Sequence, residues 1–270
     1  MKNVEYICIF AAIGIMGCGT TYLDNVHSIT NIQNCSPIPV IERKKKDARL
    51  DLQLQWSKDN NDIFIGEGNP DDYPIGYPVI NVKLRHTVAI GKLGIDYSIS
   101  DIWFLYGKLG SGILDNHNYF TSNIGVGAHI NSKYICTQWY FSTGMNQFYS
   151  DAVIEKYQWG SDQEFIETPQ GKALGLVIGL GSQFITNFHY RYWPNIYAGI
   201  DVQAIQFCQT TAYALHVINP TIGAIENIKN NNQLIISIGY PKIFPQHGND
   251  KAFMWPTFLL EWIVRLPLKK

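Results

Sequence analysis

Apolar and polar residues alternate along most of the chain that follows Asp47. In residues 48–56 (ARLDLQLQW), an apolar side chain occupies every second position, with Arg, Asp and Gln between. Because successive side chains of a β-strand point to opposite faces, this period of two predicts a strand with one apolar and one polar face. The same alternation recurs at 80–88, 93–99, 103–110, 124–131, 135–141, 174–181, 196–203 and 258–266, and residues 233–240 form another short apolar strand.

No long segment of the sequence has the periodicity of a helix. Residues 214–228 are the one candidate for a short helix, and Pro220 and Gly223 within them argue against it, since both residues disfavour a helix interior. The chain is therefore predicted to be all-β, with about ten strands.

Connections of very unequal length separate the predicted strands. Two are long and polar, at 57–78 and 145–171, whereas Ser100-Asp101 and Ser132-Lys133 mark short turns. Short turns joined to one or two long loops are typical of an up-and-down barrel with unequal rims. We predict an antiparallel up-and-down, transmembrane β-barrel of about 8–12 strands.

Alternation alone does not say whether the apolar face points outward, to lipid, or inward, to a core. Three features favour an outward apolar face. The polar face carries glycines that leave room in a narrow lumen, the alternating stretches approach the ~9–11 residues of a tilted bilayer crossing, and rings near strand ends resemble interfacial girdles. These rings are Trp56, Tyr97, Trp103, Tyr119, Tyr190, Trp193 and Trp262. A soluble sandwich or lipocalin-like barrel has the same period and stays open as the alternative.

The first residues have the features of an export signal. Residues 4–17 form an apolar run after Lys2 that is too short for a transmembrane helix. The run ends in Ile15-Met16-Gly17-Cys18, which resembles a bacterial lipobox and implies lipidation of Cys18. An ordinary signal peptide cleaved near Gly17 or Gly19 is the alternative. We predict a signal peptide at 1–17, a lipidated tether at 18–46 and the barrel domain at 47–268.

The predicted tether ends in a cluster of charged residues. Residues 19–41 are mostly polar and contain the sequence SPIPV, and residues 42–47 read ERKKKD. We interpret the cluster as a solvated linker, with a basic collar beside anionic lipid or lipopolysaccharide headgroups as the alternative.

Composition supports an exported barrel and excludes one class of partner. The chain has 270 residues, of which 16% are charged, 46% hydrophobic and 13% aromatic, at a mean hydropathy of −0.08. Ordinary soluble domains have about 25% charged residues. A net charge of −1 gives no electrostatic reason to expect nucleic-acid binding. The charges are missing from one face of nearly every predicted strand.

Three stretches resemble hairpins of small bacterial outer-membrane barrels of the OmpA-like or OmpW-like class. They are Leu93–Gly112 (LGIDYSISDIWFLYGKLGSG), Lys172–Gln183 (KALGLVIGLGSQ) and Trp193–Gln203 (WPNIYAGIDVQ). The resemblance is one of pattern over roughly residues 47–266. It implies a barrel in the outer membrane of a bacterial cell, integral, lipid-anchored or both.

Candidate chemistry is sparse. Some barrels of this kind modify lipid A with a His and a Ser near the rim, and His189 is the best candidate here for such a catalytic residue. For His189, His86 and His129, a structural role is the favoured interpretation. The acidic stretch 67–72 lacks the ligand spacing of a calcium loop. No cysteine spacing indicates zinc or a disulfide framework. In an exported protein, one pair among Cys35, Cys136 and Cys208 could form a disulfide. We expect no metal and no cofactor.

Charged residues of both signs fall on the polar faces of the strands. If the apolar faces point outward, these charges line the lumen, where a salt-bridge network is the favoured interpretation and a path for small solutes the alternative. The predicted lumen network is Arg49, Asp51, Lys83, Arg85, Asp96, Lys108, Asp201, Glu261 and Arg265.

Three functional hypotheses follow. The first is a non-enzymatic outer-membrane barrel, lipidated at Cys18, with a structural or surface-interaction role and with outer-membrane lipid or lipopolysaccharide as its partner. The second is a lipid A-modifying barrel enzyme. The third is a soluble lipocalin-like lipoprotein that binds an apolar ligand.

Overall fold

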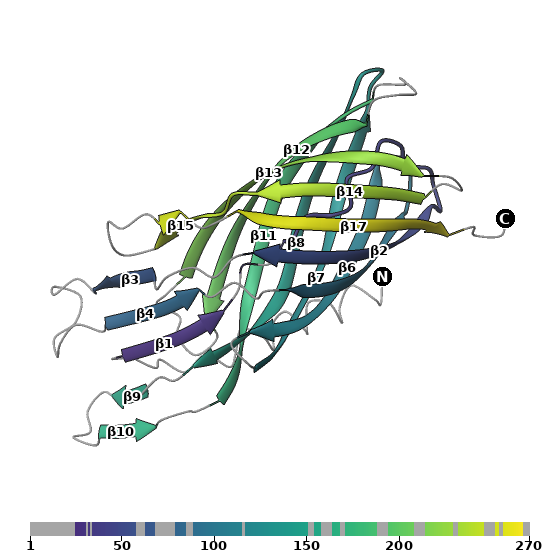
Figure 1. Cartoon of the computed structure of the whole chain (residues 1–270). Helices are drawn as coiled ribbons and strands as arrows, with labels where there is room; N and C mark the ends of the chain where they lie inside the picture. Colours follow the sequence, from purple (N-terminus) through teal and green to yellow (C-terminus); the bar gives the residue numbers. More distant parts are fainter. Residues whose placement is uncertain are drawn as a thin grey trace.

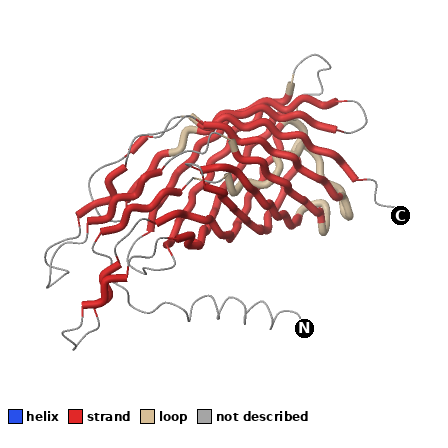
Figure 2. Tube along the Cα trace, turned by 60° about the horizontal axis from the view of Figure 1, so that its bottom comes forward, coloured by secondary structure: helices blue, strands red, loops and turns tan. Residues whose placement is uncertain are grey.

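The structure is a computed structural model in which ten strands form a closed antiparallel barrel. It describes residues 25–30, 32, 34–57, 63–67, 79–84, 89–114, 117–150, 154–157, 164–167, 171–187, 194–207, 214–228, 232–245, 252–253 and 256–266. Within these ranges the regular structure is all strand, and no helix is present that would be long and apolar enough to cross a membrane (Figure 2). The predicted all-β, up-and-down barrel is confirmed.

Strands that follow one another in the barrel wall pair with one another, so the wall is an up-and-down meander. It closes where the last strand pairs with the first, from Thr257 opposite Ser57 to Leu266 opposite Ala48. In chain order the wall strands are β2 (Ala48–Ser57), β5 (Ile90–Ser98), β6 (Trp103–Leu114), β7 (His117–Asn131), β8 (Ile135–Ser150), β11 (Gly171–Thr186), β12 (Asn195–Phe207), β13 (Ala214–Ile228), β14 (Asn232–Gly239) and β17 (Thr257–Leu266).

The two rims of the barrel differ in the length of their connections. At the short-turn rim, residues 99–102, 132–134, 187–194 and 229–231 join neighbouring wall strands. At the opposite, long-connection rim, three of the connections carry additional strands (Figure 1). These are β3 (Ile63–Glu67), β4 (Val79–Leu84), β9 (Ile154–Tyr157), β10 (Glu164–Glu167), β15 (Lys242–Pro245) and β16 (Ala252–Phe253).

The chain reaches the barrel wall only after crossing the lumen. β1 (Asn25–Thr30) pairs with β4 and with the last residues of β8, so it lies at the long-connection rim. The backbone N–H of Lys46 donates to the carbonyl of Ser98 at 2.8 Å, which is at the short-turn rim. We call residues 32–47, which run between these points, the lumen segment. The chain therefore crosses from the long-connection rim to the short-turn rim once before the ten wall strands begin.

Outward-facing side chains are apolar on all ten wall strands. One large residue from each strand, exposed by between 44% and 63%, shows this: Leu52, Leu93, Leu109, Ile124, Trp139, Leu180, Ile196, Ile222, Ile236 and Leu260. Inward-facing side chains are mostly polar and are at most 6% exposed in the matching set: Gln53, Asp96, Lys108, Asn123, Gln138, Gln183, Asp201, Asn219, Ser237 and Glu261. The barrel therefore has a polar interior and an apolar exterior.

Two of the expected elements differ from those observed. Residues 80–88 were expected as a wall strand, but β4 ends at Leu84 and pairs with β1 and β3. Residues 214–228, the short-helix candidate, form wall strand β13. Pro220 is tolerated there because it lies between the part of β13 that pairs with β15 and the part that pairs with β14, where the ladder is interrupted.

The expected girdle of rings is only partly outward. Trp56, Tyr97, Trp103 and Trp262 are exposed on the outer face. Tyr119 is 1% exposed and belongs to the interior, because it lies on the inward face of β7. Tyr190 and Trp193 lie outside the described residues.

Candidate functional site: the barrel lumen and its N-terminal segment

The lumen segment is extended because of its sequence. Pro37 and Pro39 fix their own φ angles and push the residues before them, Ser36 and Ile38, away from helical conformations. Neither proline has an N–H, so this stretch cannot act as a regular strand. Its carbonyl groups still need donors once they are buried. The barrel wall supplies these donors.

Side chains of the wall hydrogen-bond to the main chain of the lumen segment at most of its described residues. Six contacts carry this pattern: Gln55 Nε2 to Ile32 O (3.2 Å), Tyr106 Oη to Cys35 O (2.9 Å), Asn123 Nδ2 to Cys35 O (3.2 Å), Gln183 Nε2 to Pro37 O (3.1 Å), and Gln138 Nε2 to Ile38 O (3.3 Å) and to Val40 O (3.4 Å). In the other direction, Cys35 N donates to Asp201 Oδ2 at 3.3 Å. Six wall strands thus contact one extended chain.

Two apolar side chains of the lumen segment fill the interior near the short-turn rim. Ile38 and Val40 are 1% and 2% exposed, and they pack with buried residues of six wall strands: Cys136, Ile185, Tyr197, Ile225, Ile235 and Ile263. Because alternate residues of an extended chain point to the same side, this cluster accepts positions 38 and 40 together.

Arg43 anchors the lumen segment to the wall. Its guanidinium pairs with both carboxylate oxygens of Asp96, and both side chains are completely buried. The same guanidinium donates to Gln138 Oε1 at 3.0 Å and lies 3.6 Å from the centre of the Phe104 ring. A bidentate, fully desolvated pair of this kind fixes both partners, because either charge alone would be very costly to bury.

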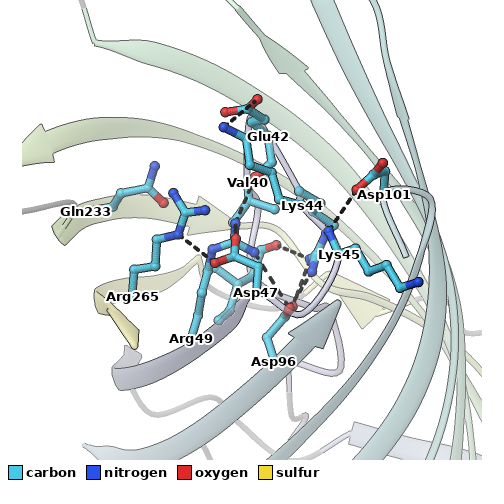
Figure 3. A network of polar contacts seen from close by, with 12 residues as sticks. Val40, Glu42, Lys44, Lys45, Asp47, Arg49, Asp96, Asp101, Gln233 and Arg265 are labelled. Carbon is cyan, nitrogen blue, oxygen red and sulfur yellow. Dashed lines mark hydrogen bonds and ion pairs between the residues drawn. The ribbon is translucent and has the colours of Figure 1, made fainter. Parts of the chain in front are cut away.

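A second set of ion pairs holds the point where the segment enters β2. Asp47 pairs with Arg49 and accepts a hydrogen bond from Arg265 Nε at 2.6 Å (Figure 3). Arg49 also donates to the carbonyl of Glu42 at 2.8 Å and lies 3.9 Å from Asp96. Arg43 and Asp47 therefore belong to the interior network, whereas Lys44, Lys45 and Lys46 between them are exposed.

A separate charged cluster lies deeper in the lumen. Lys108 Nζ is 3.0 Å from Asp51 Oδ2, and Gln53 Nε2 donates to Glu261 Oε1 at 2.7 Å. Lys92 is buried beside them and is 3.5 Å from the carbonyl of Asn34. Among the described residues, the cluster contacts the lumen segment through Lys92 and otherwise consists of wall residues.

Aromatic rings of the interior lie over glycines of the neighbouring strand. Tyr106 is the cross-strand partner of Gly125, and Phe104 is the partner of Gly127. A Cβ atom on Gly125 would lie 2.4 Å from the Tyr106 ring, and one on Gly127 would lie 2.2 Å from the Phe104 ring. These glycines let large rings lie flat against the wall and leave the centre of the lumen to the segment.

Six residues of the expected lumen network lie buried in the interior: Arg49, Asp51, Asp96, Lys108, Asp201 and Glu261. Arg265 is 35% exposed at the short-turn rim. Lys83 lies on β4, which is not a wall strand, and Arg85 lies outside the described residues. The six buried residues all lie on the inward faces of their strands.

Sequence reasoning missed the residues that bind across the lumen. A tether was expected at 18–46, but its described residues, 32 and 34–46, form most of the lumen segment. Polar composition and prolines are shared by linkers and by chains whose carbonyls are bound by side chains. Arg43 and Lys92 carried no periodic signal of their own. The isolated SPIPV sequence, which enforces an extended chain, was the one available indication.

The candidate catalytic and modification residues are largely outside the described ranges; these include His189, His86, Cys18 and most of the acidic stretch 67–72. His129 is buried on the inward face of β7. Cys35 and Cys136 are free thiols, and both are buried. Within the described part of the chain, no group of three or more His, Cys, Asp and Glu residues could hold a metal ion.

Comparison of the chain with protein-family models, curated proteins and solved structures found no match. The fold itself, a closed antiparallel ten-strand barrel, is consistent with the class of outer-membrane barrels.

Proposed function

We propose that the chain is an integral β-barrel protein of the bacterial outer membrane, closed by its own lumen segment, with a structural or surface-interaction role and no enzymatic activity. The observation that carries this proposal is the apolar outer face present on all ten wall strands. Lipid is the partner that such a face fits.

The energetic argument compares lipid with water around the same wall. Burying one large aliphatic or aromatic side chain is worth about 1.5–3 kcal/mol. In water, a wall with such residues outward on every strand would lose this burial free energy for each of these side chains. A lipocalin-like barrel places apolar residues inside and polar residues outside, which is the opposite of the arrangement of Asp51 and Leu52 here.

The two ends of the outer face carry rings that suit a membrane interface. The rings of Trp56 and Phe258 pack in a tilted arrangement near the long-connection rim, with centroids 5.4 Å apart, and Tyr97 and Trp103 lie near the short-turn rim. Tryptophan and tyrosine favour the headgroup region, where the ring is buried and its polar atom is solvated.

The lumen segment argues against an open pore. It places buried side chains such as Ile38 and a desolvated ion pair across the interior. In the proposed membrane protein, contact with molecules outside the cell is therefore made by the long-connection rim and its extra strands. That rim is the proposed surface for interaction. Lipidation of Cys18 would add an anchor to the integral barrel and stays a prediction.

Fractionation of cells that express the full chain tests the proposal. We expect the protein in the outer-membrane fraction, resistant to carbonate extraction, with a folded form that migrates differently from the boiled form on a gel. Recovery of folded protein in plain buffer without detergent would overturn the proposal and would favour a soluble barrel.

The proposed orientation has its own test. Outer-membrane barrels have short periplasmic turns and longer extracellular loops, so the short-turn rim should face the periplasm. Because the lumen segment crosses the barrel, an epitope tag inserted before β1 should bind antibody on intact cells. A tag at Lys133, which is exposed in the turn between β7 and β8, should bind only after permeabilisation. Labelling of both tags on intact cells, or of neither, would contradict the crossing, and the reverse result would contradict the orientation.

A further inference from the structure

We propose that the barrel lumen is a binding site for an extended polypeptide main chain. Residues 32–47 occupy this site in the intact molecule, and a separate peptide of the same sequence would bind there in their place. The proposal concerns the interior of the barrel and does not depend on where the barrel lies in the cell.

The first argument is the kind of atom that the wall contacts. Gln55, Tyr106, Asn123, Gln138 and Gln183 come from five wall strands, and each donates to a backbone carbonyl of the lumen segment. Carbonyl groups are present at every residue of any polypeptide. Side-chain donors aimed at carbonyls along the length of the segment therefore recognise an extended chain as such, as the edge of a sheet does in strand addition.

The second argument is that specificity enters at three positions of the segment. The apolar cluster receives the side chains of Ile38 and Val40, and Asp96 receives the guanidinium of Arg43, which also lies over Phe104. The ligand class is thus an extended peptide with two apolar residues at alternate positions and an arginine three residues after the second.

The third argument is that the wall does not need the segment for its own backbone pairing. The ten wall strands pair with one another around the whole circumference. Lys46 and Asp47 exchange backbone hydrogen bonds with Ser98 of β5, but residues 34–45 belong to no strand and contribute no pairing to the sheet. Removing them leaves the backbone ladder of the barrel complete and exposes polar side chains that water can solvate.

The exposed turn near the end of the lumen segment, just before β2, allows the test to be made in a folded barrel. We suggest replacing Lys44–Lys46, all exposed, by the recognition site of a specific protease. Cleavage of the purified, folded protein in detergent converts the lumen segment into a separate chain. Its retention on size exclusion, and its exchange with a fluorescent synthetic peptide of residues 31–43, are then measured by mass spectrometry and fluorescence anisotropy.

We expect the cleaved fragment to stay bound or to be replaced saturably by the labelled peptide, with uncleaved protein binding none. A peptide with Arg43→Glu should bind at least ~100-fold more weakly, since it removes one partner of a buried ion pair. Gln138→Ala in the barrel should weaken the wild-type peptide several-fold, because it removes donors to two carbonyls.

Three results would overturn the proposal. The fragment leaves and the peptide does not bind; the Arg43→Glu peptide binds as well as the wild type; or the cleaved barrel unfolds. A variant that lacks residues 19–43, refolded with and without the peptide, repeats the measurement without a protease. Failure of that variant to fold even with the peptide present would show that the segment is an integral part of the fold and not the occupant of a site.

Discussion

The two faces of the barrel wall differ sharply, and two neighbouring residues of β2 show the difference. Asp51 is fully buried and pairs with Lys108, whereas its neighbour Leu52 is 56% exposed. The inner face solves the problem of buried charge with ion pairs and with an extended segment whose carbonyls accept hydrogen bonds. The outer face has no such partners within the described chain. The comparison teaches that the two faces are stabilised differently. Other residues of the protein compensate the charges of the inner face, whereas the described chain leaves the apolar outer face uncovered.

The largest expected effect on the inner face comes from Asp96→Ala. The substitution leaves the completely buried guanidinium of Arg43 without its carboxylate, and we expect a loss of about 3–5 kcal/mol in the free energy of unfolding. Denaturant titration in detergent, followed by the change in gel mobility, measures it. Lys44→Ala, which breaks the exposed pair with Glu42, should change stability by no more than ~0.5 kcal/mol. Equal effects of the two variants would contradict a desolvated interior.

On the outer face, Leu52→Lys distinguishes lipid from water. In a membrane, a lysine near the bilayer midplane costs about 2–4 kcal/mol. At a site facing water, the same surface substitution would stay within about 0.5 kcal/mol. Refolding into lipid vesicles, with Leu52→Ala as the control, measures the difference. A neutral Leu52→Lys would remove the distinction between the two faces.

A smaller effect is expected where rings lie over glycine. Gly127→Ala would place a Cβ atom 2.2 Å from the Phe104 ring, and we expect a loss of about 1–3 kcal/mol as the ring is displaced. Gly91→Ala is a matched control, because its Cβ would have 3.9 Å to the nearest atom, the carbonyl oxygen of Ser111. The same unfolding assay applies. If Gly91→Ala were the more harmful substitution, the close-packed interior would be in doubt.

The sequence allowed the wall to be predicted to the extent that each strand carries its own signal. Alternation in residues 48–56 and 258–266 indicated both strands and the face of Asp51 and Glu261. It misled at 80–88, where the period is regular but β4 pairs with β1 and β3 and not with a wall strand. β13 was missed because Pro220 obscures its period, and only the interrupted ladder around it makes the proline acceptable.

The lumen segment was less predictable because its structure depends on distant partners. Arg43 and Asp96 are 53 residues apart, and Cys35 and Asp201 are 166 residues apart. Nothing local distinguishes a proline-containing tether from a chain that is bound along its carbonyls. The prediction that 42–47 is a solvated linker holds for the exposed Lys44, Lys45 and Lys46, and the buried Arg43 and Asp47 depart from it.

The central claim is that the apolar outer face of the barrel contacts lipid, and the emission of the outward tryptophans tests it most directly. Trp56, Trp103, Trp139 and Trp262 are between 46% and 54% exposed on that face. In vesicles of a lipid brominated along its acyl chains, we predict that most of the tryptophan emission is quenched relative to vesicles of the unbrominated lipid. Unchanged emission in the brominated vesicles, from folded protein, would contradict the claim.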